Sequence, residues 1–142
     1  MKIKVIFICT GNSCRSQIAE GILKNETNNK FEVFSAGSHP SRLHPAAVSV
    51  MQEWGIDISK HKSESINNYI DKDIDIVITV CNNANQSCPI FPKSKLKLHW
   101  NIQDPFHGWG NNKEDLQPYR LTRNDLKNRI DKFLLSNEIR QL

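Results

Sequence analysis

The sequence predicts an α/β fold in which a four-stranded, parallel and twisted sheet carries helices on both faces. Two observations lead to this prediction. Four short runs have the length and the apolar pattern of strands. Segments with a helical spacing of apolar residues separate most of these runs, and such alternation is typical of a parallel sheet. A length of 142 residues fits one domain, so we expect residues 1–142 to form a single domain around one core.

The first strand is predicted at residues 2–8, because the apolar end of this run indicates burial on both faces of a sheet. Residues 9–15 then form a polar turn that contains Gly11. A helix is expected to begin near Ser16, because apolar residues follow it at helical spacing, namely Ile18, Ala19, Ile22 and Leu23.

The middle of the chain is predicted to hold a second strand and two further helices. Residues 31–35 form an apolar run that ends in a turn, which favours a strand. Residues 45–54 suit a helix, because Pro45 lies in its first turn and Gly55 lies just past its end. A short helix is expected at residues 63–69.

The last part of the chain is predicted to complete the sheet and to add a C-terminal helix. Residues 74–80 form a strongly apolar third strand, and residues 95–100 suggest a fourth. The segment 101–117 has no clear period, so we expect it to be irregular. Residues 122–135 predict a helix whose inward face consists of Leu126, Ile130, Phe133 and Leu134.

Three polar residues are expected to meet at one edge of this sheet. Cys9 follows the first predicted strand, Cys81 follows the third, and Asp104 lies shortly after the fourth. In open parallel sheets, ligands bind beyond the carboxyl ends of the strands. We therefore expect a functional site at this edge, built from residues that are far apart in the sequence.

The composition excludes some classes of function. The formal net charge is only +4 and the basic residues are scattered among acidic ones, so no nucleic-acid partner is expected, although a small anion would be attracted. No apolar run is long enough to span a membrane. The N-terminal apolar run covers only residues 5–8 and no small-residue cleavage site follows, so we expect a cytoplasmic protein without a signal peptide.

Four cysteines raise the question of a disulfide framework or a metal site. They are spaced as Cys-x4-Cys and Cys-x6-Cys, without the close Cys-x2-Cys pairs that zinc sites use. A reducing compartment makes structural disulfides unexpected. We therefore expect no metal and no cofactor, with zinc as the alternative that this spacing disfavours.

The turn between the first strand and the first helix is predicted to bind an oxyanion. Backbone N–H groups in such a turn form an anion-binding concavity, and the helix dipole adds to it. Gly11 permits a tight backbone path, and Arg15 offers a planar fork of donors to two oxygens. The loop lacks the Gly-Lys-Ser/Thr of nucleotide-binding loops. The expected oxyanion-binding residues are Thr10, Gly11, Asn12, Ser13, Cys14, Arg15 and Ser16.

Cys9 is the candidate nucleophile of this loop. The field of the loop favours the thiolate form of a cysteine, which is the reactive form. Ser16 is placed to donate a hydrogen bond to that thiolate. The alternative is a buried cysteine at a strand end followed by an ordinary capped turn, but the whole Cys-x5-Arg-Ser pattern in this position favours catalysis.

The Cys-x5-Arg-Ser loop near the N-terminus, with Asp104-Pro105 late in the chain, resembles the low-molecular-weight protein tyrosine phosphatase superfamily. Within it, the chain looks more like the thioredoxin-coupled arsenate reductases than the phosphatases. The segments that carry this resemblance are CTGNSCRSQIAEG, SAGSHP, GIDISKHKS, VITVCNNANQSCPIFP and HWNIQDP. The resemblance implies a phosphatase-like, flavodoxin-like three-layer fold, in agreement with the strands predicted above.

The resemblance also implies a role for Cys81 and Cys88. In the reductases, the first cysteine attacks arsenate, the second forms a disulfide with it as arsenite leaves, and the third takes over that disulfide for thioredoxin to reduce. Glutathione with glutaredoxin is the alternative reductant, and an incidental Cys88 is the alternative role. If residues 81–88 were helical, the two Cα atoms would lie about 10 Å apart, whereas a disulfide needs roughly 5.5–6 Å. We therefore expect a mobile segment there.

Asp104 is the general acid that the resemblance implies, since the chemistry expels an oxygen leaving group. A plain Asp-Pro turn is the alternative. The phosphatases usually have Tyr after this pair, whereas this chain has Phe106, which weakens the phosphatase interpretation. The residues 106–119 also differ from the reductases, so substrate access is not predicted.

Two further residues are expected to support the loop, and one to replace a cation. Asn12 and Ser35 match positions that hold the loop in shape. In some reductases these positions surround potassium, and we expect Lys62 to substitute for that ion. The alternative is an exposed lysine.

The leading prediction is a monomeric arsenate reductase that acts on arsenate, or on phosphate as a side reaction, with thioredoxin as its partner. A low-molecular-weight protein tyrosine phosphatase with a Cys9 phosphoenzyme is the alternative enzyme. A non-catalytic oxyanion-binding or redox-sensing protein is the alternative from another class, and it would keep its function after Cys9→Ser.

Overall fold

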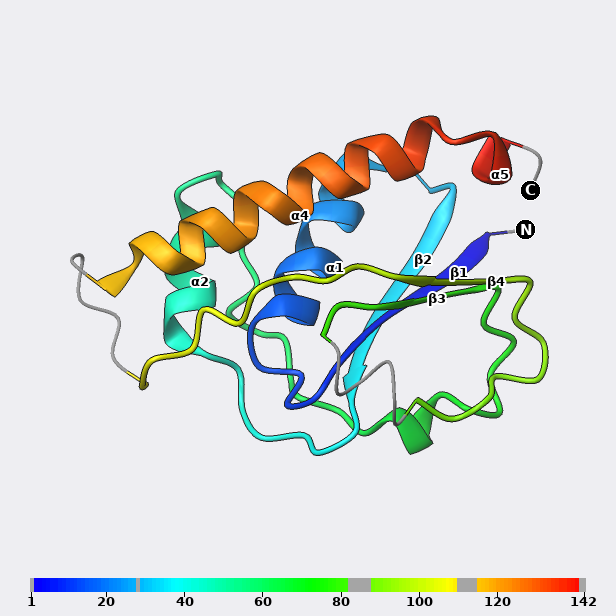
Figure 1. Cartoon of the computed structure of the whole chain (residues 1–142), viewed down its shortest axis with the longest axis horizontal. Coiled ribbons are helices and arrows are strands. Elements are labelled where there is room, and N and C mark those ends of the chain that lie inside the picture. Colours follow the sequence, from blue (N-terminus) through cyan, green and yellow to red (C-terminus); the bar gives the residue numbers. More distant parts are fainter. Residues whose placement is uncertain (1, 28, 82–87, 110–114, 141–142) are drawn as a thin grey trace.

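The computed structural model describes residues 2–27, 29–81, 88–109 and 115–140 (Figure 1). Within these residues, four parallel strands form one sheet in the order β2-β1-β3-β4. The strands are β1 (Ile3–Cys9), β2 (Phe31–Gly37), β3 (Ile76–Thr79) and β4 (Leu96–His99). The predicted parallel four-stranded sheet is thus confirmed.

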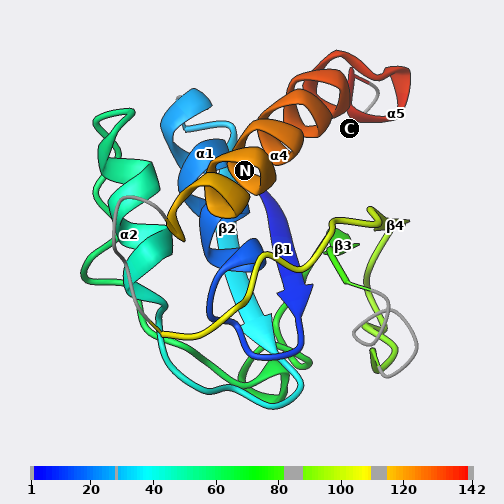
Figure 2. The same ribbon diagram turned by 60° about the vertical axis from the view of Figure 1, so that its left-hand side comes forward.

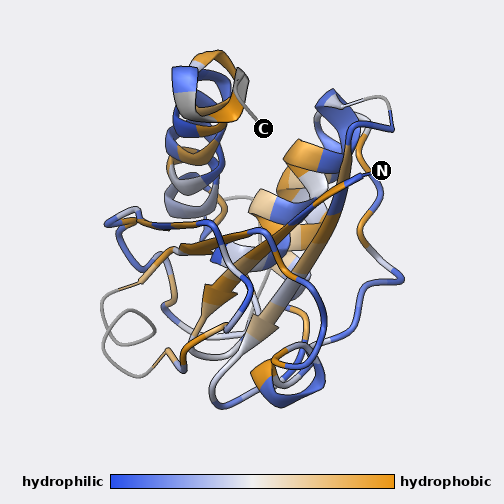
Figure 3. Cartoon of the chain, turned by 90° about the vertical axis from the view of Figure 1, so that its right-hand side faces the viewer, coloured by the Kyte–Doolittle hydropathy of each residue, from blue (hydrophilic) through white to orange (hydrophobic). Residues whose placement is uncertain are grey.

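The central strands are apolar along their length because both of their faces are covered. Residues 5–9 of β1 and all of β3 are buried. The edge strand β4 instead alternates half-buried leucines with exposed Lys97, since only one of its faces packs on the core. Figure 3 shows the apolar strands at the centre of the molecule.

The helices of the described residues lie on both sides of the sheet. They are α1 (Arg15–Glu26), α2 (Pro45–Gln52), the 3-10 helix η1 (Ile66–Asn68), α4 (Gln117–Leu135) and α5 (Asn137–Arg140). Helix α1 packs on β1 and β2, and both α2 and α4 pack against α1 (Figure 2).

Two residues of β2 show which helix covers which face. The ring of Phe31 lies 6.3 Å from Phe133 of α4, and the ring of Phe34 lies 5.2 Å from Tyr69 beside η1. Because side chains alternate along a strand, Phe31 and Phe34 point to opposite faces. Helices are therefore present on both faces, and on the face of Phe34 the described residues provide the 3-10 helix η1.

Some boundaries differ from the prediction. The C-terminal helix begins at Gln117 instead of residue 122, because Pro118 occupies its first turn, where a missing N–H costs nothing. The helix expected at 45–54 ends at Gln52, and the one expected at 63–69 is only the three-residue η1. None of the helices in the described part of the chain has the length and apolarity to cross a membrane.

The parallel arrangement brings the carboxyl ends of the strands to one edge. Cys9 at the end of β1 is in register with Gly37 at the end of β2, and Thr79 of β3 is in register with His99 of β4. The loops that follow these strands therefore gather at this edge (Figure 2). It is the edge at which the sequence predicts a site.

Candidate active site

Cys9 ends β1 and Arg15 begins α1, so the predicted oxyanion-binding loop joins a strand end to a helix N-terminus. It forms one wall of a small cavity of about 190 Å³, a size that suits an oxyanion better than a large organic ligand. The residues lining the cavity are Cys9, Thr10, Gly11, Ser13, Cys14, Arg15, Ser41, Asp104, Phe106 and Trp109.

The sulfur of Cys9 is hydrogen-bonded to Ser16. Cys9 Sγ lies 2.9 Å from Ser16 Oγ, and both side chains are buried. Asn12 Nδ2 donates to the same Ser16 oxygen at 2.8 Å. Since that oxygen already accepts from Asn12, the hydroxyl hydrogen of Ser16 is available to Cys9. A donated hydrogen bond stabilises a thiolate more than a thiol, so this geometry supports Cys9 as the nucleophile.

Asn12 holds the loop in shape. Its backbone φ of 47° lies in the left-handed region, which Asn tolerates better than most residues. Its Nδ2 also donates to Ser35 Oγ at 2.9 Å, and its Oδ1 accepts from the backbone N–H of Glu64 at 2.8 Å. The side chain therefore links the loop to β2 and to the segment before η1.

Arg15 and Asp104 meet at the rim of the cavity. Arg15 Nη2 lies 3.7 Å from Asp104 Oδ2, and Arg15 Nη1 donates to the carbonyl of Ile102 at 3.1 Å. The Asp104 side chain is 60% exposed, so solvent and substrate can reach its carboxyl group. The structure thus brings together the predicted oxyanion-binding guanidinium and the predicted acid.

Cys81 lies beside the loop. Its sulfur is 3.4 Å from Thr10 Oγ1, and Thr10 directly follows Cys9. Cys81 is buried, whereas Cys88 is half-buried, with its sulfur 3.4 Å from the carbonyl oxygen of Pro89. Burial raises the pKa of the Cys88 thiol. The predicted mobile segment falls on residues 82–87, which lie outside the described residues.

Cys14 is the second cysteine of the loop and differs from Cys9. It is buried, and burial together with the nearby Cys9 raises the pKa of the Cys14 thiol far above its usual range. A thiol that stays protonated is a poor nucleophile. Cys14 therefore contributes its place in the loop rather than a reacting sulfur.

The structure does not support the cation role predicted for Lys62. This residue is exposed, and in the described part of the chain its ammonium group makes no hydrogen bond or ion pair. Only its backbone carbonyl takes part, accepting from Gln17 Nε2 at 3.0 Å. The ammonium that reaches this network belongs to Lys24, which is paired with Glu20, and Glu20 accepts from Ser35 Oγ at 2.6 Å. The direction of the Lys62 side chain is set by an irregular segment, which sequence pattern does not reveal.

Sequence reasoning did not identify Phe106 as part of the aromatic wall of the cavity. His44, Phe106 and Trp109 pack together beside Arg15 and Asp104, and the Arg42 guanidinium lies 4.1 Å from the centre of the Trp109 ring. Two aromatic residues within the sequence Phe106-His107-Gly108-Trp109, next to Asp104-Pro105, were the available signal.

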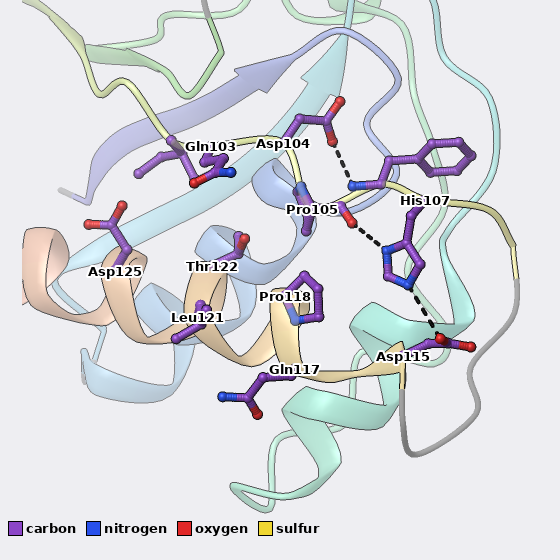
Figure 4. A pocket seen from close by; sticks show the side chains of 12 residues that line it. Gln103, Asp104, Pro105, His107, Asp115, Gln117, Pro118, Leu121, Thr122 and Asp125 are labelled. Carbon is purple, nitrogen blue, oxygen red and sulfur yellow. Dashed lines mark hydrogen bonds and ion pairs between the residues drawn. The ribbon is translucent and has the colours of Figure 1, made fainter.

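A second, larger cavity of about 760 Å³ adjoins the first and shares Asp104 and Phe106 with it (Figure 4). His107 lies between its two walls: its Nδ1 donates to the carbonyl of Pro105 at 2.8 Å, and its Nε2 lies 3.8 Å from Asp115. Among the described residues, no group of three His, Cys, Asp or Glu side chains could hold a metal ion.

Comparison with known proteins places these features in a family. The profile of the low molecular weight phosphotyrosine protein phosphatase family matches residues 4–141. Arsenate reductase 1 of Staphylococcus epidermidis is 42% identical over 132 residues, which cover 93% of this chain and 96% of that protein. The arsenate reductase of Bacillus subtilis is 40% identical over 134 residues, covering 94% of this chain and 96% of that protein.

Solved structures of similar fold point to the same family. An arsenate reductase in the phosphate-binding state superposes with a TM-score of 0.80 at 36% identity, covering 95% of this chain and 98% of the other. A low molecular weight protein tyrosine phosphatase from T. tengcongensis gives a TM-score of 0.74 at 29% identity, covering 94% and 98%. The chain therefore belongs to the low molecular weight phosphotyrosine protein phosphatase family.

Proposed function

We propose that this protein is an arsenate reductase that uses Cys9, Cys81 and Cys88 in sequence. The observation that carries the proposal is the contact between Thr10 and Cys81, which puts a second cysteine beside a loop suited to binding a tetrahedral oxyanion. A phosphatase needs only the first cysteine. The relatives that bear the name arsenate reductase support the same conclusion.

The first step forms a bond between sulfur and arsenic. The Cys9 thiolate attacks arsenate, whose oxygens are held by the backbone N–H groups of the loop and by Arg15. One arsenate oxygen leaves as water after protonation, and Asp104 supplies a proton. Ser16 stabilises the thiolate before the attack, through the contact described above.

The second step transfers two electrons to arsenic. Cys81 attacks the sulfur of Cys9, the electron pair of the sulfur–arsenic bond goes to arsenic, and arsenite leaves. The Cys88 thiolate then attacks Cys81 and releases Cys9 as a thiolate. A disulfide between Cys81 and Cys88 remains, and an external dithiol, for which we propose thioredoxin, reduces it and completes the cycle.

The relay requires reduced cysteines, so we also propose that the protein works in the cytoplasm. We propose further that the chain acts as a single domain and a monomer. Phosphate shares the shape and charge of arsenate, and the T. tengcongensis phosphatase has the same fold. Slow hydrolysis of aryl phosphates through Cys9, Arg15 and Asp104 is therefore expected as a side activity.

The test is arsenate-dependent NADPH oxidation with thioredoxin and thioredoxin reductase. The wild type should turn over continuously, whereas Cys81→Ser and Cys88→Ser should each stop after at most one turnover. Hydrolysis of p-nitrophenyl phosphate by the same two variants is the control, because that reaction needs only Cys9, Arg15 and Asp104. Absence of arsenate turnover, with hydrolysis undiminished in both variants, would instead identify a phosphatase.

A further inference from the structure

His44 connects helix α2 to the segment that follows Asp104. It is completely buried at the N-cap of α2, where its Nδ1 accepts the backbone N–H of Ala46 at 2.9 Å. Its Nε2 lies 2.6 Å from the carbonyl oxygen of Gly108. Because Nδ1 accepts, the proton of the neutral ring is on Nε2, and that nitrogen donates to Gly108. One tautomer therefore satisfies both contacts.

The ring of His44 also packs against two aromatic residues that line the Cys9 cavity. It stacks on Trp109, with ring centres 5.0 Å apart and planes 16° apart. It meets the edge of Phe106 at 5.8 Å. Tyr119 of α4 also packs on the ring, with ring centres 4.9 Å apart, and its hydroxyl oxygen lies 3.1 Å from Nε2. The ring is thus fixed in orientation from several directions.

These contacts affect the position of Asp104 through Phe106. The backbone N–H of Phe106 donates to Asp104 Oδ1 at 3.0 Å, so the position of Phe106 affects the direction of the carboxyl group. Because the Asp104 side chain is 60% exposed, packing around it does not fix its position. The segment that carries it is held by its anchors, of which His44 contacts Phe106, Gly108 and Trp109.

We propose that His44 is a positioning residue, which holds the segment 104–109 so that Asp104 can protonate the leaving oxygen. This inference rests on the proposed function only in taking Asp104 as the general acid. His44 itself does not line the cavity that contains Cys9. It acts through the Gly108 carbonyl and the aromatic contacts.

The charges around His44 agree with this role. Burial is the main cause that lowers the pKa of His44, and the nearby Arg42 and His107 lower it further, while the Gly108 carbonyl opposes them. Tyr119 is a further titratable group in contact with the ring, among the residues that the structure describes. The neutral ring, which both hydrogen bonds require, is therefore the form present near neutral pH.

Two substitutions separate the contacts of the ring. His44→Asn keeps an oxygen near the position of Nδ1, and Asn is a favoured N-cap, but it cannot reach Gly108. His44→Gln places an amide N–H near the position of Nε2 and loses the cap. His39→Asn is the matched control, because His39 precedes α2 on the same segment and is exposed, with only Ser38 as its side-chain partner in the described part of the chain.

The readout is hydrolysis of p-nitrophenyl phosphate and of phenyl phosphate. The first has a good leaving group that needs little protonation, whereas the second depends on the general acid, an effect worth about 10²–10⁴-fold. We expect His44→Asn to lower kcat/KM, which reports the step in which the leaving group departs, about tenfold more for phenyl phosphate than for p-nitrophenyl phosphate, with a smaller difference for His44→Gln. Melting temperatures establish that each variant is folded.

The outcomes are distinct. If a folded His44 variant lost the same factor in kcat/KM for both substrates, or lost nothing, the proposal would be overturned. A residue with a merely structural role would not distinguish the two leaving groups. Asp104→Asn shows how strongly removal of the acid itself separates the two substrates. If this variant lost the same factor in activity for both substrates, the acid role of Asp104 and the His44 proposal would both be overturned. Neither result depends on arsenate, so the outcome is separable from failure of the reductase assay.

Discussion

Cys9 and Ser16 are joined by a contact of 2.9 Å between sulfur and hydroxyl oxygen, across the whole length of the oxyanion-binding loop. If Ser16 donates to a thiolate, Ser16→Ala should slow the reaction of Cys9 with iodoacetamide at neutral pH. A hydrogen bond to a charged group contributes about 1.5–3 kcal/mol, so we expect a slowing of about tenfold or more. Mass spectrometry of the modified peptide measures the rate at Cys9 alone.

The control for this variant is in the same loop. Ser13 Oγ is buried and has no hydrogen-bond partner among the described residues, so Ser13→Ala removes a hydroxyl without removing that contact. Equal rates for wild type and Ser13→Ala, with a slower Ser16→Ala, would support the assignment. Equal rates for all three would contradict it.

Asn12 should matter for stability as well as for activity. Asn12→Ala leaves the backbone N–H of Glu64 without its partner and puts Ala in the left-handed region, so we expect a loss of about 2–4 kcal/mol in the free energy of unfolding. Asn12→Gly removes the same hydrogen bonds without the backbone strain and should lose about 1 kcal/mol less. Urea denaturation measures both. Equal losses would show that the backbone conformation contributes nothing.

Arg15→Lys tests the fork geometry at constant charge. A guanidinium can bind two oxygens of an oxyanion at once, whereas an ammonium acts as a point charge. We expect inorganic phosphate to inhibit p-nitrophenyl phosphate hydrolysis about tenfold or more weakly in the variant. If the same phosphate concentration inhibited the variant and the wild type equally, Arg15 would contribute only its charge.

The stability of the protein should fall on the acid side of neutrality, in part through His44. Burial lowers the pKa of His44 below its ordinary value of 6.5, so below that value the unfolded chain binds a proton that the folded chain excludes. Stability is therefore lost as the pH falls through this range. His61, whose pKa burial also lowers, acts in the same direction.

The contribution of His44 can be isolated by difference. His44→Asn removes its titration but leaves His61 unchanged, so the melting temperature of the wild type should fall more steeply than that of the variant between about pH 7.5 and about pH 5. Parallel profiles would show that His44 does not couple protonation to folding.

The convergence of Cys9, Cys81 and Asp104 could be predicted because it follows from topology. Once the strands are parallel, their carboxyl ends lie at one edge, and residues after them must meet there. The loop residues could be predicted for the same reason, since a strand end, a polar turn and a helix start are local features. Asn12 and Ser35 were found through resemblance, and the structure supplies the hydrogen bond between them.

The contacts of His44 could not be predicted. Its partner Gly108 is 64 residues away, on a segment without regular period, and the pattern around His44 indicates only the start of a helix. The pairing of Lys24 with Glu20, which in turn accepts from Ser35, is part of the Ser35 network and was not predicted. Lys24 lies one helical turn after Glu20 on α1, so their pairing was available from spacing, whereas Lys62 lies on an irregular segment.

The central claim is that oxidation moves from Cys9 to Cys81 and then to Cys88. It is tested most directly by adding one equivalent of arsenate to reduced protein without any reductant, then mapping disulfides by mass spectrometry. The wild type should form one arsenite and a disulfide between Cys81 and Cys88, and Cys88→Ser should trap a disulfide between Cys9 and Cys81. Arsenite formation without either disulfide, or neither product in the wild type, would contradict the relay.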